Sequence, residues 1–424
     1  MAVDILLGLQ WGDEGKGKIV DFIAPRYDIV ARFQGGPNAG HTLVFDGVKH
    51  VLHQIPSGIF HQNIVNVIGN GVVLDPIVFK KEIMGLRNRG SKPEENLYVS
   101  YKTQLILPTH RLLDAASENQ KGDKKIGSTL KGIGPTYQDK YARQGLRVGD
   151  ILLSDFVQRY EQLVAKHKAQ LDAAGHAYAD TLPALEAEFM EAVAFLRTFK
   201  LADTEYLLNN WLAEGKTILA EGAQGALLDI DFGSYPFVTS SSTMAAGACT
   251  GLGVAPRHIG EVYGIFKAYC TRVGSGPFPT ELHDEVGENI RQQGREFGST
   301  TGRPRRCGWL DLPALRYAVM INGVTQLLMM KADVLDSFAE IEVCTHYRLA
   351  DGSLTQQLPY THTSDIVTPV YQTLKGWNTS LAGISDYTKL PQALLDYVAF
   401  IEKEIGVPVK LISTGPDRSE TIVR

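Results

Sequence analysis

Residues 8–18 of the sequence read Gly-Leu-Gln-Trp-Gly-Asp-Glu-Gly-Lys-Gly-Lys. The stretch follows a short apolar run, Ile5–Leu7, and precedes Ile19–Ile23, a segment of helical character. A strand, a glycine-rich turn and a helix in this order aim backbone N–H groups and a helix N-terminus at an anion. The stretch therefore predicts a phosphate-binding loop after the first strand of an α/β fold.

The spacing of this loop agrees with a P-loop at all but one position. Gly12 is followed by four residues and then by Gly17 and Lys18, but Ile19 stands where a P-loop has the Ser or Thr that binds Mg²⁺. Asp13 offers a replacement oxygen ligand, because Mg²⁺ prefers carboxylates and phosphates. An ordinary turn with two surface lysines remains the simpler alternative on spacing alone.

Length and composition narrow the class of protein. The chain has 424 residues, 44% of them hydrophobic and 21% charged, which suits a globular protein with a substantial core. Its net charge of −5 argues against a general nucleic-acid-binding surface. The cysteines are far apart and form no C-x-x-C pair, so they indicate neither a disulfide framework nor a zinc site: Cys249, Cys270, Cys307 and Cys344.

Targeting and membrane signals are also missing from the pattern. The N-terminus enters a strand-like run almost at once, without the basic and apolar regions of a signal peptide. No apolar segment approaches the ~20 residues that a membrane helix requires. We expect a cytoplasmic protein that does not enter a membrane.

Short aliphatic runs recur along the chain, and several are followed by polar residues and helical patterns. They predict strands at Ile5–Leu7, Ile29–Phe33, Ile64–Ile68, Leu105–Leu107, Ile218–Ala220, Val262–Phe266, Leu327–Met330 and Val409–Ile412. This alternation predicts a large, mostly parallel central sheet flanked by helices. Residues 150–213 have helical periodicity, with Ser154 as the expected N-cap, and predict a helical excursion from a single domain that spans residues 1–424.

Glycine-rich and polar segments follow several of these runs, where ligands bind in parallel sheets. His41 lies in Gln34–Thr42, and Gln224 in Glu221–Gly225 carries the donor and acceptor needed to read a base edge. Three further segments are rich in hydroxyl or basic residues: Gly127–Pro135 with Lys140, Arg143 and Arg147 after it, Val238–Thr243, and Gly298–Arg306. Each alone is also consistent with a structural histidine or a solvated loop.

Five of these segments together resemble the adenylosuccinate synthetase family. In order they are Q-W-G-D-E-G-K-G-K from Gln10, G-G-P-N-A-G-H-T from Gly35, E-G-A-Q-G from Glu221, T-T-G-R from Thr300 and S-T-G-P-D-R from Ser413. The resemblance covers essentially the whole chain. It implies a P-loop-NTPase-like phosphate loop in the predicted fold, and GTP-dependent ligation of IMP and L-aspartate to adenylosuccinate through a 6-phosphoryl-IMP intermediate, in AMP synthesis.

The resemblance also implies roles for individual residues. Asp13 is the expected base that removes the N1 proton of IMP, and His41, Lys16 and Gln224 are the other expected catalytic residues. One Mg²⁺ per subunit is expected on Asp13 and the carbonyl of Gly40. Arg143 is expected to reach the IMP of the neighbouring subunit, which implies a homodimer. A GTP-binding regulatory switch is the alternative, since the phosphate loop and the K-x-D of Lys331–Asp333 also suit it.

The binding residues that the resemblance implies form three overlapping sets. For GTP they are Gly12, Asp13, Glu14, Gly15, Lys16, Gly17, Lys18, Gly40, His41, Thr42, Arg305, Lys331, Ala332, Asp333, Ser413, Thr414 and Gly415. For IMP they are Asp13, Lys16, Asn38, Ala39, Gly40, His41, Thr129, Arg143, Gln224, Thr239 and Arg303. For L-aspartate they are Ser299, Thr300, Thr301, Gly302, Arg303 and Arg305.

Overall fold

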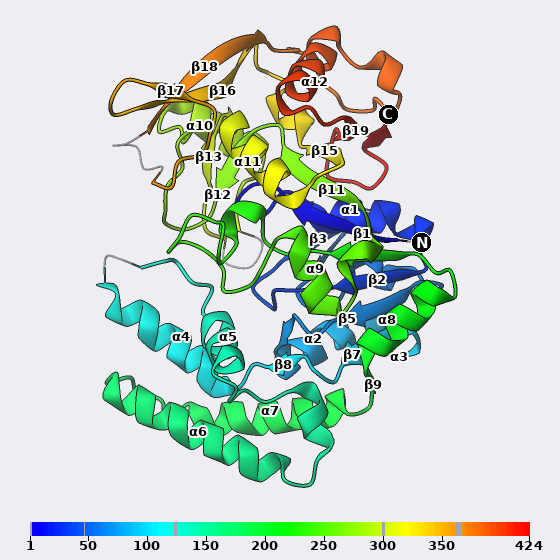
Figure 1. Cartoon of the computed structure of the whole chain (residues 1–424), viewed down its shortest axis with the longest axis vertical. Helices are drawn as coiled ribbons and strands as arrows, with labels where there is room; N and C mark the ends of the chain where they lie inside the picture. Colours follow the sequence, from blue (N-terminus) through cyan, green and yellow to red (C-terminus); the bar gives the residue numbers. More distant parts are fainter. Residues whose placement is uncertain (1, 46, 123–124, 299–301, 362–366) are drawn as a thin grey trace.

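A large, mostly parallel sheet forms the centre of the structure, a computed structural model that describes residues 2–45, 47–122, 125–298, 302–361 and 367–424 (Figure 1). Within these residues the sheet has ten strands, in the spatial order β20 (Thr421–Val423), β19 (Val409–Ser413), β15 (Gln326–Met330), β11 (Ile259–Lys267), β1 (Val3–Gly8), β10 (Ile218–Glu221), β2 (Ile29–Arg32), β5 (Val65–Ile68), β7 (Leu97–Ser100) and β9 (Lys200–Ala202). Only β20 among these runs antiparallel to its neighbour. The predicted fold class is confirmed.

Both faces of the sheet are buried, which explains why its strands are continuous aliphatic runs. Successive residues of a strand point to opposite faces, and in β1 the side chains of Ile5 and Leu7 join one core while Leu6 joins another. The helix that follows β1, α1 (Lys16–Ile23), packs Ile19 and Val20 into the core that contains Leu6. The phosphate loop is therefore held at both ends by buried elements.

The remaining α-helices flank the sheet or extend from it. They are α2 (Pro76–Arg87), α3 (Pro93–Asn96), α4 (Pro108–Gln120), α5 (Ile133–Tyr141), α6 (Phe156–Ala173), α7 (Leu182–Leu196), α8 (Thr204–Ala213), α9 (Ala245–Leu252), α10 (Glu285–Gln293), α11 (Leu312–Asn322) and α12 (Gln392–Ile405). Helices α6 and α7 lie at one end of the molecule, and α4 and α5 lie between them and the sheet (Figure 1). Within the described residues, no helix is both long and apolar enough to cross a membrane.

Small sheets and ribbons decorate this centre. A mixed sheet at the opposite end of the molecule from α6 contains β14 (Leu310–Asp311), β16 (Glu340–Leu349), β17 (Leu354–Thr355) and β18 (Val367–Lys375) (Figure 1). Strand β14 runs parallel to β16, whereas β17 and β18 run antiparallel to it. Two-stranded pairs are formed by β3 (His41–Phe45) with β4 (Val48–Leu52), β6 (Val73–Leu74) with β8 (Gln104–Leu105), and β12 (Cys270–Arg272) with β13 (Arg306–Gly308). The aliphatic pattern of the sequence predicts none of these strands except at Leu105 of β8.

Three details of the predicted architecture are wrong. The run Leu105–Leu107 is not a strand of the central sheet: Leu105 ends the short strand β8, and Leu107 is the N-cap of α4. The excursion at residues 150–213 is not only helical, because its strand β9 returns to the edge of the sheet beside β7. The N-cap of α6 is Asp155 rather than Ser154. The extent of the single domain stays a prediction.

Candidate active site

Several of the polar segments singled out in the sequence meet at one edge of the central sheet. Six neighbouring parallel strands, β19, β15, β11, β1, β10 and β2, end at this edge. The residues that follow them are, in the same order, the turn after Ser413, Lys331–Asp333, Ala268–Tyr269, the phosphate loop, Gly222–Gly225 and Gln34–Gly40. The fold therefore brings together side chains that are hundreds of residues apart in the chain.

The phosphate loop is organised around the buried carboxylate of Glu14. Its Oε1 accepts hydrogen bonds from the backbone N–H groups of Gln10 (3.1 Å) and Gly12 (2.9 Å), and its Oε2 accepts one from Lys16 Nζ (2.5 Å). A Cβ on Gly225 would lie 2.5 Å from Glu14 Oε1, so only glycine fits beside it. The charge of Lys16 is balanced by Glu14.

Lys18 connects the phosphate loop to the C-terminal turn. Its buried ammonium donates to Ser413 Oγ (2.7 Å), the Gly415 carbonyl (2.7 Å) and the Glu420 carbonyl (2.9 Å). Burial lowers its pKa to about 8. The guanidinium of Arg418 adds an ion pair with Asp21 of α1, at 2.6 and 2.8 Å. Lys18 is therefore placed to hold two predicted GTP-binding segments together.

His41 lies against the first turn of α1, and a helix N-terminus is a place where negative charge is stabilised. A Cβ on Gly17 would lie 2.9 Å from His41 Cβ, so a glycine is needed for the two segments to approach. His41 Nδ1 lies 2.5 Å from Glu221 Oε1. Burial, reinforced by the nearby Arg32 charge, lowers the pKa of His41 to about 4.

Predicted site residues carry buried polar atoms with no hydrogen-bond partner among the described residues. These atoms are Asn38 Oδ1, His41 Nε2, Gln224 Oε1 and Asp333 Oδ1. Buried polar groups in proteins are normally satisfied, so orphaned ones at a single sheet edge indicate a ligand that supplies the partner. Gln224 has a backbone φ of 55°, in the sparsely populated left-handed region, which further marks it as a functional position.

A network of ion pairs links Asp13 to the K-x-D segment. Asp13 Oδ2 lies 2.7 Å from Arg305 Nε, and Arg305 Nη1 donates to Glu296 Oε2 at 2.6 Å. Glu296 Oε1 also accepts from Lys267 and Lys331, each at 2.8 Å, and it is fully buried. Burial opposes the ionisation of Glu296, but its cationic neighbours hold its pKa well below the usual value.

The structure places the other predicted site residues less closely. Asp333 is half-buried beside the turn that contains the buried Ala332, and burial raises its pKa. Thr129 and Arg143 are exposed, Arg143 just beyond the end of α5, and Thr239 is half-buried. Gly302 and Arg303 are exposed in a loop closed at its base by the Gly298 N–H bond to the Arg303 carbonyl (2.8 Å). Ser299, Thr300 and Thr301 lie outside the described residues.

Sequence reasoning assigned no role to three buried charged residues of the site. Glu221 and Lys267 are the last residues of β10 and β11, and this strand-end position was the signal that could have identified them. Glu296 follows α10 in an irregular segment, and no motif marks it. All three are fully buried charges whose partners come from distant parts of the chain.

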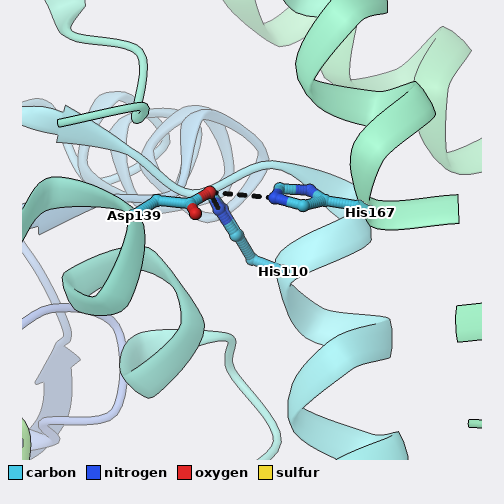
Figure 2. Close-up of side chains that lie close together, drawn as sticks. All are labelled: His110, Asp139 and His167. Carbon is cyan, nitrogen blue, oxygen red and sulfur yellow. Dashed lines mark hydrogen bonds and ion pairs between the residues drawn. The ribbon is translucent and has the colours of Figure 1, made fainter. Parts of the chain in front are cut away.

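A second cluster of titratable side chains lies among the helices α4, α5 and α6. His110 Nε2 and His167 Nε2 lie 2.9 and 2.8 Å from the same oxygen of Asp139, as Figure 2 shows. The Leu107 N–H donates to His110 Nδ1 (2.9 Å), so His110 Nε2 carries the hydrogen and has no lone pair for a cation. The arrangement therefore ties three helices together and does not suit a metal.

Comparisons with known proteins give one consistent result. A family model described as adenylosuccinate synthetase matches residues 5–422. Adenylosuccinate synthetases of Cytophaga hutchinsonii and Parabacteroides distasonis are 65% and 61% identical, over all of this chain and 98% and 99% of theirs. The structure of fully ligated adenylosuccinate synthetase from Plasmodium falciparum is similar with a TM-score of 0.94 and 37% identity, and each chain covers 100% of the other.

Proposed function

Since the chain belongs to the adenylosuccinate synthetase family, we propose how its residues divide the work of that reaction. The enzyme is a GTP-dependent ligase of AMP biosynthesis, and its substrates are IMP, GTP and L-aspartate. The observation that supports the division of roles is the set of orphaned buried atoms on Asn38, His41, Gln224 and Asp333. The regulatory switch is set aside, because a switch does not require a second nucleotide site.

Asp13 is the general base of the proposed mechanism. The 6-oxygen of IMP is a poor leaving group, so the reaction first makes it a better one by phosphorylation. Removal of the N1 proton by the Asp13 carboxylate concentrates negative charge on that oxygen. The oxygen then attacks the γ-phosphorus of GTP, the bond from that phosphorus to the β,γ-bridging oxygen breaks, and GDP leaves. The Arg305 guanidinium, whose Nε lies 2.7 Å from Asp13 Oδ2, holds this carboxylate in place.

His41 and Gln224 act on the charge that develops during transfer. His41 Nε2 faces the transferring phosphoryl group from beside the first turn of α1, and Gln224 holds the 6-oxygen of IMP. The amine of L-aspartate then attacks C6 and phosphate leaves, giving adenylosuccinate. Lys16 assists by leaving Glu14 for the phosphates when they enter the loop.

The remaining binding roles follow the edge of the sheet. The phosphate loop with Gly40–Thr42 holds the GTP phosphates, and Lys331, Asp333 and the turn from Ser413 to Gly415 recognise guanine. Asn38, Thr129, Thr239 and Arg303 surround IMP. The loop of Gly302 and Arg303 closes over L-aspartate, with an arginine on a carboxylate.

Mg²⁺ is the metal that the proposed site suits. The donors available near the phosphate loop are the partly exposed Asp13 carboxylate and the Gly40 carbonyl, both hard oxygen ligands. When bound there, Mg²⁺ would neutralise charge on the phosphate oxygens.

We also place the enzyme in the cytoplasm, as expected from the sequence.

Activity of single-residue variants tests these roles. Purified protein mixed with IMP, GTP, Mg²⁺ and L-aspartate should produce adenylosuccinate. The absorbance of adenylosuccinate measures its formation. His41→Asn and Gln224→Ala should each lower kcat by about 10²-fold or more, while a non-hydrolysable GTP analogue still binds. Wild-type kcat in either folded variant would contradict the role of that residue.

We propose further that the enzyme is a homodimer in which Arg143 serves the partner's IMP site. The exposure of Arg143 at the end of α5 supports this, because the side chain is available to another subunit. Mixing the inactive variants Asp13→Asn and Arg143→Ala tests it: after subunit exchange, about a quarter of all sites should be intact. No recovery of activity from exchanged subunits would mean that Arg143 acts within its own chain.

A further inference from the structure

Glu221 is a buried carboxylate directly behind His41. It is the last residue of β10, where the parallel register places it beside Leu6 of β1 and Arg32 of β2. Its Oε1 lies 2.5 Å from His41 Nδ1 and accepts a hydrogen bond from Ser57 Oγ at 2.7 Å. Its Oε2 accepts from the Ser57 N–H at 2.8 Å. Both oxygens are therefore fixed in place.

A carboxylate in this position must be paired, because burying an unpaired charge is costly. Glu221 and Arg32 are both fully buried, and the positive charge of Arg32 acts on Glu221 from the adjacent strand. Burial opposes ionisation, but the His41 hydrogen bond and the Arg32 charge keep the pKa of Glu221 below its usual value. Glu221 is thus an anion that can only accept hydrogen bonds.

This anion determines which edge of the imidazole faces the site. Because Glu221 only accepts, His41 Nδ1 carries the hydrogen between them. A ring that turned over would lose this bond and leave the carboxylate without its partner. His41 Nε2 is consequently the atom presented on the other side, and it is the buried atom without a partner in the described chain.

We propose that Glu221 is the positioning residue of His41, holding Nδ1–H so that Nε2 faces the transferring phosphoryl group. The inference rests on the proposed role of His41. Glu221 touches neither the nucleotide nor the phosphoryl group in this arrangement, so it acts entirely through the ring. When His41 donates through Nε2 the ring is positively charged, and the carboxylate behind it offsets that charge.

The test is a double-mutant cycle between Glu221 and His41. Glu221→Gln should lower kcat by roughly 10- to 1,000-fold, because the amide is uncharged and has only one oxygen, whereas Glu221 accepts from His41 Nδ1 and from the Ser57 N–H on separate oxygens. It should change the affinity of a non-hydrolysable GTP analogue by less than about three-fold. In the His41→Asn background the same substitution should cause no further loss of kcat. An equal loss in both backgrounds, or none in either, would overturn the proposal.

A matched control separates positioning from simple disturbance of the fold. Glu82 is another carboxylate that accepts backbone N–H bonds near this site, from His53 (2.6 Å) and Gln54 (3.1 Å), whereas His41 Nδ1 is bonded to Glu221. Glu82→Gln should leave kcat within about two-fold of the wild type. A loss of kcat as large as that of Glu221→Gln would overturn the proposal.

Two further measurements keep the result decisive. If Glu221→Gln does not fold, Ser57→Ala is the substitute, because it removes one hydrogen bond that fixes the Glu221 carboxylate. The loss of kcat that Ser57→Ala causes must vanish in the His41→Asn background, or the proposal fails. The ¹⁵N spectrum of the histidine rings, assigned with His41→Asn, should show hydrogen on Nδ1 in the wild type. If His41→Asn itself keeps wild-type kcat, the proposed role of His41 fails, whereas the spectrum still reports whether Glu221 holds the ring.

Discussion

Replacing Glu296 by glutamine removes the negative charge around which Lys267, Lys331 and Arg305 gather. The most affected partner is Lys267, which is fully buried and has its ammonium 2.8 Å from Glu296 and 2.8 Å from Thr271. Burial already lowers the pKa of Lys267 to about 8. Without Glu296 the interior holds this cation with no counter-charge at hydrogen-bond distance.

The expected loss is large for a nearly isosteric substitution. Breaking a buried ion pair by removing one partner costs ~3–5 kcal/mol. Glutamine retains a hydrogen-bond acceptor, so we expect a decrease of about 3 kcal/mol in the free energy of unfolding. Urea unfolding followed by circular dichroism measures it. Adding Lys267→Met should recover part of the loss, because the stranded cation is removed.

A surface ion pair provides the control. Lys81 and Glu188 lie 2.9 Å apart with side chains 68% and 43% exposed, and Glu188→Gln should cost less than about 1 kcal/mol. The GTP analogue should also bind Glu296→Gln more weakly, since Lys331 loses an anchor. A loss of stability no larger than that of the control would refute the reasoning.

Three further predictions concern catalysis, base recognition and pH. Asp13→Asn should lower kcat by about 10²- to 10⁴-fold while GTP-analogue affinity stays near normal, because a general base is lost; unchanged turnover would contradict its role. Asp333→Asn should raise the KM for GTP at least 10-fold and improve the use of XTP, whose 2-oxygen suits the amide; an unaltered preference between the two nucleotides would argue against base reading by Asp333. Burial lowers the pKa of His110 to about 4, whereas an unfolded chain's histidine titrates near ~6.5. The unfolded chain then binds the proton first, so stability should fall by roughly 3 kcal/mol from pH 6.5 to pH 4. Urea unfolding across this pH range should show a smaller fall in stability for His110→Asn than for the wild type. An equal fall in both would contradict the lowered pKa of His110.

The fold was predictable where periodicity and strand-end glycines agree. Aliphatic runs such as Ile218–Ala220 are buried on both faces, and their pattern alone indicates a parallel sheet. Strand β9 could not be predicted, because Lys200–Ala202 has three residues and no aliphatic pattern. Its place in the sheet depends on pairing with β7, which is a long-range contact.

The candidate site was predictable to the extent that its residues lie in local motifs. Asp13 and Gln224 each occur in a glycine-rich loop directly after a buried strand, and His41 opens β3 at the end of another such loop. The sequence contains these glycine-rich motifs. Glu296 could not be found this way, because its importance arises from Lys267, Lys331 and Arg305, which only the folded chain brings to it. The placement of Ser299–Thr301 lies outside the described residues, so their role in binding L-aspartate stays a prediction.

The bonds from Lys18 to Ser413 and Gly415 span 395 and 397 residues of chain. The helix with Lys18 is synthesised long before the turn to which it is bonded. A polypeptide that stops before Ser413 therefore has the phosphate loop without the turn that we propose for guanine. On that proposal, GTP binding requires synthesis at least as far as Gly415.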